Sequence, residues 1–261
     1  MMIRQVTVGV DGSVIAVRAL DRAAEEATLR GAALTIVYAV PDVDVAGPVL
    51  ATAVLRARGR HPGLAVTALA VAGSPVRALA HHGRSAELTV VGGRGSGVLG
   101  GLVAGSVSRR LAARTRGPLL VVRGAQGAPG GAVLLWTEGE RDVEAAAFAF
   151  AEAERRGARL CVLRAEASRY AKARRQALVP DDGACRSLRA ERPLSRPGGE
   201  SPAWPGSLPP SRPVRALLEA TRGAAVVVVG VQHRGHRPGP VARALLRHAH
   251  CPVVIVPDAP E

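Results

Sequence analysis

A glycine-rich stretch in the first half of the chain, GGRGSGVLGGLVAGS at 92–106, has the residue types that bind phosphate. Seven of its fifteen residues are glycine, and it directly follows the apolar run ELTVV. Glycines after a strand let the backbone approach phosphate oxygens and direct its N–H groups at them. The segment SVSRRL is expected to start a helix, whose N-terminus adds a partial positive charge and free N–H donors. The stretch is therefore a candidate phosphate-binding loop.

Two common phosphate-binding patterns do not explain this stretch. GSGVLG at 95–100 matches the dinucleotide pattern G-x-G-x-x-G, but it follows a late strand, and no carboxylate follows at the distance needed to bind a ribose. The Walker pattern requires Gly-Lys-Ser/Thr, and the stretch contains no lysine. A third pattern, G-x2-G-x9-G-S/T, fits without a gap. Its fixed positions are Gly92, Gly95, Gly105 and Ser106.

The elements that must position this loop occur twice along the chain. PVRAL at 75–79 recurs at 213–217, and in both copies a short helical stretch leads to an apolar run that ends in glycine, at Gly92 and Gly230. GAQGAPGG at 124–131 is the expected connector. The chain is therefore predicted to contain two copies of one unit, with domains at residues 1–125 and 130–261.

Strand-like and helix-like segments alternate in the first copy, which predicts a parallel, doubly wound α/β sheet. The second copy keeps this plan at its ends, but 167–212 is rich in Arg, Pro, Gly and Ser, so we expect a long loop and a lost or irregular third strand there. The expected strands of the first copy are 6–10, 34–40, 64–71, 88–92 and 118–123, and its expected helices are 14–30, a weaker one within 47–60, 74–85 and 106–116.

With these motifs in this order, the first copy resembles the universal stress protein family, in its ATP-binding branch and tandem-domain form. The motifs are VGVDGS, LTIVYAV, AGSPVRAL, ELTVVGGRGSG, GSVSRRL and GPLLVV, and they cover nearly all of this copy. The resemblance implies two tandem doubly wound parallel-sheet domains of the adenine nucleotide alpha hydrolase-like kind. It also implies that the last strands, PLLVV and PVVIV, pair with each other, so that the copies form a pseudo-dimer within one chain.

The resemblance further implies an ATP site in the first copy, with Mg²⁺ accompanying the nucleotide. Asp11 would lie near the adenosine, with Gly9 close through its backbone, and the backbone of Ala39 would face the adenine. Arg94 could pair directly with a phosphate. The expected nucleotide-binding residues are Gly9, Asp11, Ala39, Gly92, Gly93, Arg94, Gly95, Ser96, Gly105, Ser106, Val107 and Ser108. From the residues alone, Asp11 could instead cap a turn or the next helix together with Ser13, and the glycine loop could be a flexible connection.

The second copy departs from the phosphate-binding pattern. His233 stands where Gly95 should be, and Pro240 replaces Ser106, which removes a hydroxyl and an N–H donor. Its first strand offers Thr137 or Glu138 in place of Asp11. A second ATP site is therefore not expected, and this copy is expected to cover the first. Its loop and helix histidines are interpreted as solvated, and no metal site is predicted; they are His233, His236, His248 and His250.

Composition restricts the class of protein. The formal net charge is +14, but Lys172 is the only lysine among 35 basic residues, which leaves 34 arginines (35 − 1), and no aromatic residues are interleaved with them to stack bases. We therefore attribute this arginine content to genome composition rather than to specific nucleic-acid binding. No apolar run approaches the length of a membrane span, so a cytoplasmic protein without membrane contact is expected. Cys161 and Cys251 lie in or beside strand-like runs and are expected to be buried thiols.

The function predicted from the sequence is that of an ATP-binding, nucleotide-responsive stress or dormancy factor. We expect no enzyme activity beyond weak ATP hydrolysis, because the sequence supplies no well-placed general base. The expected partners are ATP and a regulatory protein that the sequence does not identify, and association into a homodimer is allowed. Two alternatives stay open: an interaction or scaffold module that binds no nucleotide, and a basic protein that binds nucleic acid.

Overall fold

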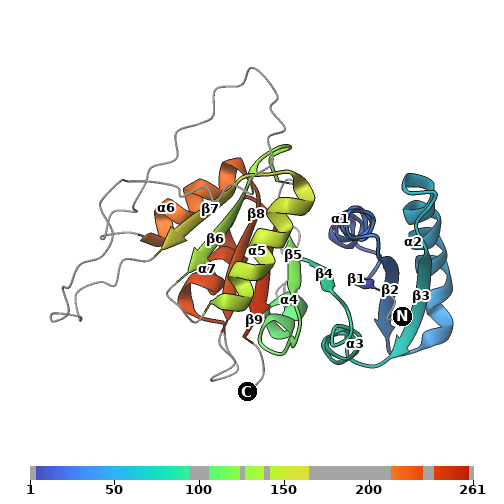
Figure 1. Ribbon diagram of the computed structural model, residues 1–261. Helices are drawn as coiled ribbons and strands as arrows, with labels where there is room; N and C mark the ends of the chain where they lie inside the picture. Colours follow the sequence, from blue (N-terminus) through green and yellow to red (C-terminus); the bar gives the residue numbers. More distant parts are fainter. Residues whose placement is uncertain are drawn as a thin grey trace, which may run out of the picture.

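Strands and helices alternate along both copies, and the strands of the two copies join into one continuous sheet (Figure 1). The computed structural model describes residues 4–93, 106–123, 127–137, 142–164, 213–231 and 238–258. Copy one contains β1 (Gln5–Val10), α1 (Val14–Arg30), β2 (Ala33–Val40), a 3-10 turn η1 (Val43–Ala46), α2 (Gly47–Arg60), β3 (Val66–Ala72), α3 (Pro75–His82), β4 (Leu88–Gly92), α4 (Ser106–Ala112) and β5 (Leu119–Val122). Copy two contains β6 (Ala132–Thr137), α5 (Val143–Arg156), β7 (Leu160–Arg164), α6 (Pro213–Ala220), a 3-10 turn η2 (Thr221–Gly223), β8 (Ala224–Val231), α7 (Pro240–His248) and β9 (Val253–Pro257).

The sheet has nine strands in the order β3-β2-β1-β4-β5-β9-β8-β6-β7. Within each copy neighbouring strands are parallel, and only the β5–β9 pair is antiparallel. This order confirms the predicted fold class of two doubly wound units that pair through their last strands. The segment in which a third strand of copy two was expected to be lost or irregular, 167–212, lies outside the described residues.

The β5–β9 pair, which we call the seam, relates the two copies by an approximate two-fold axis. Leu120 pairs directly with Val254, and these two residues occupy the same position in the repeat. On either side of this pair, Leu119 faces Ile255 and Val121 faces Val253. The seam therefore has the symmetry of a dimer interface although it lies within one chain.

Helices cover both faces of the sheet. In copy one α1 packs beside α2 and α3 packs beside α4, and the direction of the crossovers places these pairs on opposite faces. The buried side chains form two clusters, one on each face, and each cluster contains residues from both copies. The core is thus continuous across the seam, and it is built mainly from Val, Leu and Ala.

On one face of the seam, α1 packs against α5 through buried charges. Glu26 and Arg30 of α1 and Glu152 and Arg156 of α5 form a closed set of ion pairs, which we call the arginine–glutamate cluster. Arg30 Nη2 lies 2.5 Å from Glu152 Oε2, and Arg156 makes the reciprocal contact with Glu26. Both carboxylates are almost completely buried, at 1% and 2% exposed. The cluster therefore joins the copies by contacts that repeat across the two-fold axis.

These positive charges act on the titration of Glu26. Burial by itself raises the pKa of this carboxyl group, but Arg30, Arg156 and Arg22 outweigh it and hold the pKa below its usual value. Arg22 contributes through Nε, which lies 3.0 Å from Glu26 Oε1. Glu26 is accordingly a charged residue in the folded protein at neutral pH.

Most expected elements of copy one agree with the observed bounds. The helix at 14–30 starts after Ser13, whose hydroxyl accepts from Ala16 N, and ends at Gly31 with φ of 58°. Two expected helices were too long. The one at 74–85 ends at His82, and the one at 106–116 ends at Ala112, since the chain turns before Leu119 starts β5.

Among the described helices, none has the length and hydropathy required to cross a bilayer. Cys161 and Cys251 are buried, as predicted from their apolar surroundings. The domain bounds at residues 1–125 and 130–261 stay a prediction.

Candidate functional site

The carboxyl ends of β1, β2 and β4 lie next to one another at one edge of the sheet. β1 pairs in parallel with both neighbours, with Val10 opposite Tyr38 and Val8 opposite Val90. From β1 the chain passes through α1 to β2, which lies on one side of the β1–β4 pair. From β4 it passes through α4 to β5, which lies on the opposite side of that pair. In open α/β sheets, connections that leave in opposite directions form a crevice in which ligands bind.

Asp11 lies directly after β1 at this edge and is exposed. Its Oδ1 accepts a hydrogen bond of 2.9 Å from the backbone N of Ser13, across a turn in which Gly12 has φ of 77°. The structure thus shows the local role that was one of the two readings of Asp11. Within the described part of the chain no partner is found for Oδ2, so one oxygen of the carboxylate is available to a ligand.

Gly92, at the end of β4, packs against the first turn of α1. A Cβ atom at Gly92 would lie 2.4 Å from Ile15 Cγ2 and 3.2 Å from the Ile15 carbonyl oxygen. Copy two repeats this feature, because a Cβ at Gly230 would lie 2.5 Å from Asp142 Oδ1. These first loop glycines therefore have a packing role that needs no ligand.

Gly93 and Gly9 continue the close-packed edge. The backbone N of Gly93 donates to Val122 O at 2.8 Å, and a Cβ there would lie 2.8 Å from Arg123 Cγ. A Cβ at Gly9 would meet Leu79 Cδ1 of α3 at 2.7 Å. Ala39 lies in β2 opposite Val71, near the same edge.

The structure describes only the two ends of the glycine-rich loop. Arg94, Gly95, Ser96 and Gly105 lie outside the described residues. Ser106 begins α4, although its side chain is not described; Val107 packs partly buried against the core, and Ser108 is buried. The described ends therefore place the predicted loop between β4 and α4.

An apolar cavity of about 280 Å³ lies beside Asp11, between α1 and α2. Val10 and Gly12 line it from the end of β1, and Val49 and Ala53 line it from α2. Arg56 is its charged lining residue, and its Nε lies 2.6 Å from Asp21 Oδ1. This edge of copy one therefore has an apolar space next to the polar Asp11.

In copy two, a bulky side chain fills the equivalent edge. Val8 pairs with Val90 and Leu135 pairs with Val228, so the repeat places Trp136 where copy one has Gly9. The Trp136 side chain is 2% exposed and packs in the same cluster as Leu217. Thr137 follows, and its hydroxyl donates to Asp142 Oδ2 at 3.0 Å. Glu138, His233 and His236 lie outside the described residues, whereas His248 and His250 are exposed.

The comparison with known families agrees with this architecture. The model of the universal stress protein family matches residues 2–123 and again residues 133–257. The chain belongs to the universal stress protein family. The two matches confirm the tandem organisation predicted from the repeat.

Curated relatives match all or part of this universal stress protein. Universal stress protein Rv2623 of Mycobacterium tuberculosis H37Rv is 36% identical, in a match covering 45% of the chain and 44% of that protein, which is less than half of either. Universal stress protein Rv1996 of the same organism is 28% identical over 98% of the chain and 96% of its own length. A solved structure, the functionally unknown protein PA1789 of Pseudomonas aeruginosa PAO1, has a TM-score of 0.67 at 19% identity and covers 98% of the chain and 93% of its own. This last likeness shows the fold.

The structure also brings together residues to which the sequence analysis gave no role. Arg109, Arg243 and Arg247 line a second cavity of this universal stress protein, between α4 and α7. One sequence signal was available, because Arg109 and Arg243 occupy the same position of the repeat, four residues after Gly105 and Gly239. Among the described residues no group of three metal-binding side chains lies together.

Proposed function

We propose that this universal stress protein binds one ATP molecule, in copy one, and acts as a nucleotide-responsive stress or dormancy factor. The observation that carries the proposal is the meeting of β1 and β4 at the point where their connections diverge. There Asp11 and Gly92–Gly93 share one edge of the sheet, and the G-x2-G-x9-G-S sequence that begins at Gly92 leads into α4.

The phosphate end of the proposed site is the loop between β4 and α4. Its glycines allow backbone N–H groups to approach phosphate oxygens, and Ser106 would add a hydroxyl. Arg94 would pair with one phosphate through its guanidinium fork. Mg²⁺ would accompany the triphosphate and neutralise part of its charge.

The nucleoside end of the proposed site is formed by β1 and β2. The Oδ2 atom of Asp11 is suited to accept hydrogen bonds from ribose hydroxyls, since Oδ1 is already engaged by Ser13. The backbone of Ala39, near the end of β2, would face the adenine. Gly9 lies two residues before Asp11, where its backbone is expected to be close to the nucleoside.

Copy two would bind no nucleotide and would cover copy one as its pseudo-dimer partner within the chain. The buried Trp136 occupies the position of Gly9, and Pro240 at the start of α7 has neither the hydroxyl nor the N–H of Ser106. We accordingly propose one ATP per chain, and a binding protein rather than an enzyme. Its cytoplasmic location, its regulatory partner and any homodimer belong to the same proposal.

A scaffold that binds no nucleotide is the second candidate. Packing against α1 accounts for Gly92, and the equivalent Gly230 is present in a copy whose loop has lost the pattern. The first glycine is therefore weaker support for phosphate binding than Gly95, Gly105 and Ser106. A nucleic-acid-binding protein, the third candidate, predicts an affinity that falls steeply with salt concentration.

The test is to purify the protein, denature it and identify any released nucleotide by chromatography. We expect about one ATP per chain, or one bound on titration with Mg·ATP. The double variant Gly95→Ala/Ser106→Ala should lose it, because a methyl group blocks the backbone approach and a hydroxyl is removed.

A matched control lies at the same two positions of copy two. His233→Ala/Pro240→Ala should leave the nucleotide content unchanged. If the wild-type protein neither contains nor binds nucleotide, the proposal is wrong and the scaffold function takes its place. Loss of nucleotide in both double variants would show that the site is not confined to copy one.

A further inference from the structure

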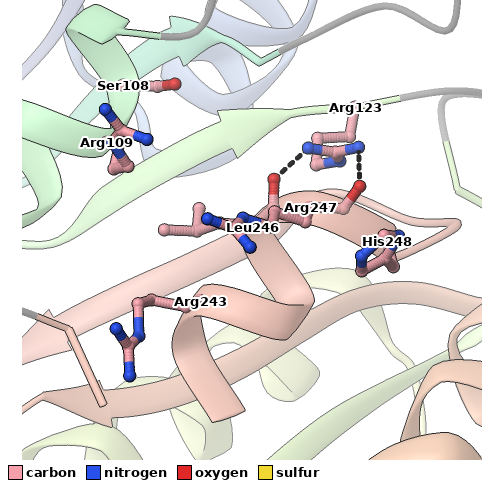
Figure 2. Close-up of a pocket in the computed structure, with 7 residues that line it drawn as sticks. All are labelled: Ser108, Arg109, Arg123, Arg243, Leu246, Arg247 and His248. Carbon is pink, nitrogen blue, oxygen red and sulfur yellow. Dashed lines mark hydrogen bonds between the residues drawn. The ribbon is translucent and has the colours of Figure 1, made fainter. Parts of the chain in front are cut away.

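A second cavity, of about 220 Å³, lies between α4 of copy one and α7 of copy two (Figure 2). Helices α1 and α5 meet on one face of the seam, and α4 and α7 belong to the other. Figure 2 shows Ser108 and Arg109 on α4 and Arg243, Leu246, Arg247 and His248 on α7, with Arg123 following β5. The cavity thus spans the two copies, and it adjoins the phosphate end of the proposed ATP site, with which it shares Ser108.

The charged side chains among the described lining residues of this cavity are basic. Four of its described lining residues are arginine, one is histidine, and none is a carboxylate. Over the ranges that the structure covers, the side chains of Arg109, Arg243 and Arg247 form no ion pair, in contrast to the paired arginines between α1 and α5. Like charges gathered around one cavity repel each other, and an anion between them would relieve this repulsion.

Arg123 differs from the others because helix capping explains its position. Its guanidinium donates to the backbone oxygens of Leu246 and Arg247 at the C-terminal end of α7. A cation there compensates the negative end of the helix dipole and satisfies free carbonyl groups. Arg123 thereby fixes α7 beside copy one and leaves the other arginines to line the cavity.

The two-fold relation of the copies explains why arginines meet here. Arg109 and Arg243 are equivalent residues of the repeat, and both line the same cavity. Arg247 adds a charge at a position where copy one has Ala113, so the clustering exceeds what the repeat alone would produce. Arginine is the residue that binds phosphate groups in a bidentate manner.

We propose that this cavity binds a small anion with two linked phosphate groups, for which inorganic pyrophosphate is the probe. Two linked phosphate groups of about −1.5 each near pH 7 together carry a charge of about −3. This charge matches that of three arginines that form no ion pair with any described residue. A water molecule occupies roughly 30 Å³ in the liquid, and the cavity therefore has room for a diphosphate in place of several waters.

The test is calorimetric titration of the full-length protein with pyrophosphate at low salt. Pyrophosphate should bind with a stoichiometry near one. In Arg109→Gln/Arg243→Gln the affinity should fall at least about tenfold, since charge-assisted hydrogen bonds to two guanidinium groups are lost. Pyrophosphate should raise the melting temperature of the wild type and not that of this variant.

Arg77→Gln/Arg215→Gln is the matched control. It also removes one exposed arginine from each copy at equivalent positions, in α3 and α6, away from this cavity. Its affinity for pyrophosphate should stay within about twofold of wild type. Equal weakening in both double variants would mean attraction by overall charge only and would overturn the proposal, as would unchanged binding in Arg109→Gln/Arg243→Gln.

Pyrophosphate binding must also be separated from the proposed ATP loop. In Gly95→Ala/Ser106→Ala pyrophosphate should bind as in the wild type, and loss of binding there would place the anion in the loop instead and overturn the proposal. The same variant titrated with ADP distinguishes two sources of the ligand. Binding of ADP would identify an esterified diphosphate, and binding of pyrophosphate alone would identify the free anion.

Discussion

Gly92 packs directly against the first turn of α1, and Gly230 packs against Asp142 at the corresponding place in copy two. The loop pattern in the sequence suggested phosphate contact for Gly92, and packing gives a separate reason for it. The sequence could not reveal this reason, because it depends on how closely α1 approaches the end of β4. The caps of α1, in contrast, were predictable, since Ser13 and Gly31 act through neighbouring backbone atoms.

We expect Gly92→Ala to lower the free energy of unfolding by about 1–3 kcal/mol, because the new methyl group would overlap Ile15. Gly59→Ala is the control. Gly59 lies within α2, and no atom is found within 4 Å of a Cβ placed there, so that change should raise stability by about 0.5–1 kcal/mol. Chemical denaturation measures both, and equal stability of Gly92→Ala and wild type would contradict the packing role.

The thiol of Cys251 should not react in the folded protein. Burial raises the pKa of Cys251 to about 12, so almost no thiolate exists at pH 8. Cys161 is also buried. In a Cys185→Ser variant, a disulfide reagent should therefore label neither remaining cysteine until denaturant is added, when both react. Fast labelling of the native protein would show that the seam around Cys251 opens readily.

At the scale of elements, apolar runs of the first copy predicted each observed strand and helix of that copy to within a few residues. The arginine–glutamate cluster was not predicted. Glu26 and Arg30 lie four residues apart on α1, and that spacing is also typical of a solvated helix face. The same spacing recurs at Glu152 and Arg156, but only the packing of α1 against α5 shows that all four residues are buried together.

Glu26→Gln should lower the free energy of unfolding by about 3 kcal/mol at pH 7, since it leaves buried guanidinium groups without a full partner. The pKa of Glu26 is below its usual value of 4.5 in the folded state, so its stabilising effect is present above that value and is lost as the pH falls through the folded pKa. The difference in the free energy of unfolding between wild type and Glu26→Gln should therefore become smaller below about pH 4.5. Urea denaturation at several pH values measures it.

Glu219→Gln serves as the control for this prediction. Glu219 forms an exposed ion pair with Arg222 within α6 and η2, and water screens such pairs, so stability should change little at any pH. If Glu26→Gln lowered the free energy of unfolding by the same amount from neutral to acid pH, the charge of Glu26 would not be the source of its stabilising effect.

At the scale of the whole molecule, the seam has the geometry of a dimer interface between unlike partners. The equivalent of Arg22 in copy two is Phe148, whose ring lies 5.9 Å from the guanidinium carbon of Arg30. The sequence repeat predicted the two copies, and the resemblance to the family predicted that their last strands pair. The difference between Arg22 and Phe148 at the interface could not be predicted, because it depends on how side chains of both copies pack together.

Residues 1–125 alone should form a dimer, because the exposed edge of β5 can pair with a second β5 as it does with β9. Glu26 would then face Arg30 of the second molecule. The dimer should be weak, since two Arg22 side chains replace one Arg22 and one Phe148. Light scattering across a range of concentrations measures the mass, and a monomer at every concentration would contradict the prediction.

The short length of chain between Val122 and Ala132 joins β5 to β6. It makes assembly of the nine-stranded sheet a unimolecular reaction, so completion of the sheet does not depend on how many molecules a cell contains. A dimer of separate subunits falls apart on dilution, whereas this sheet does not. The covalent link also gives each chain two inequivalent halves in fixed proportion, so a substitution that specialises one half leaves the other half unchanged.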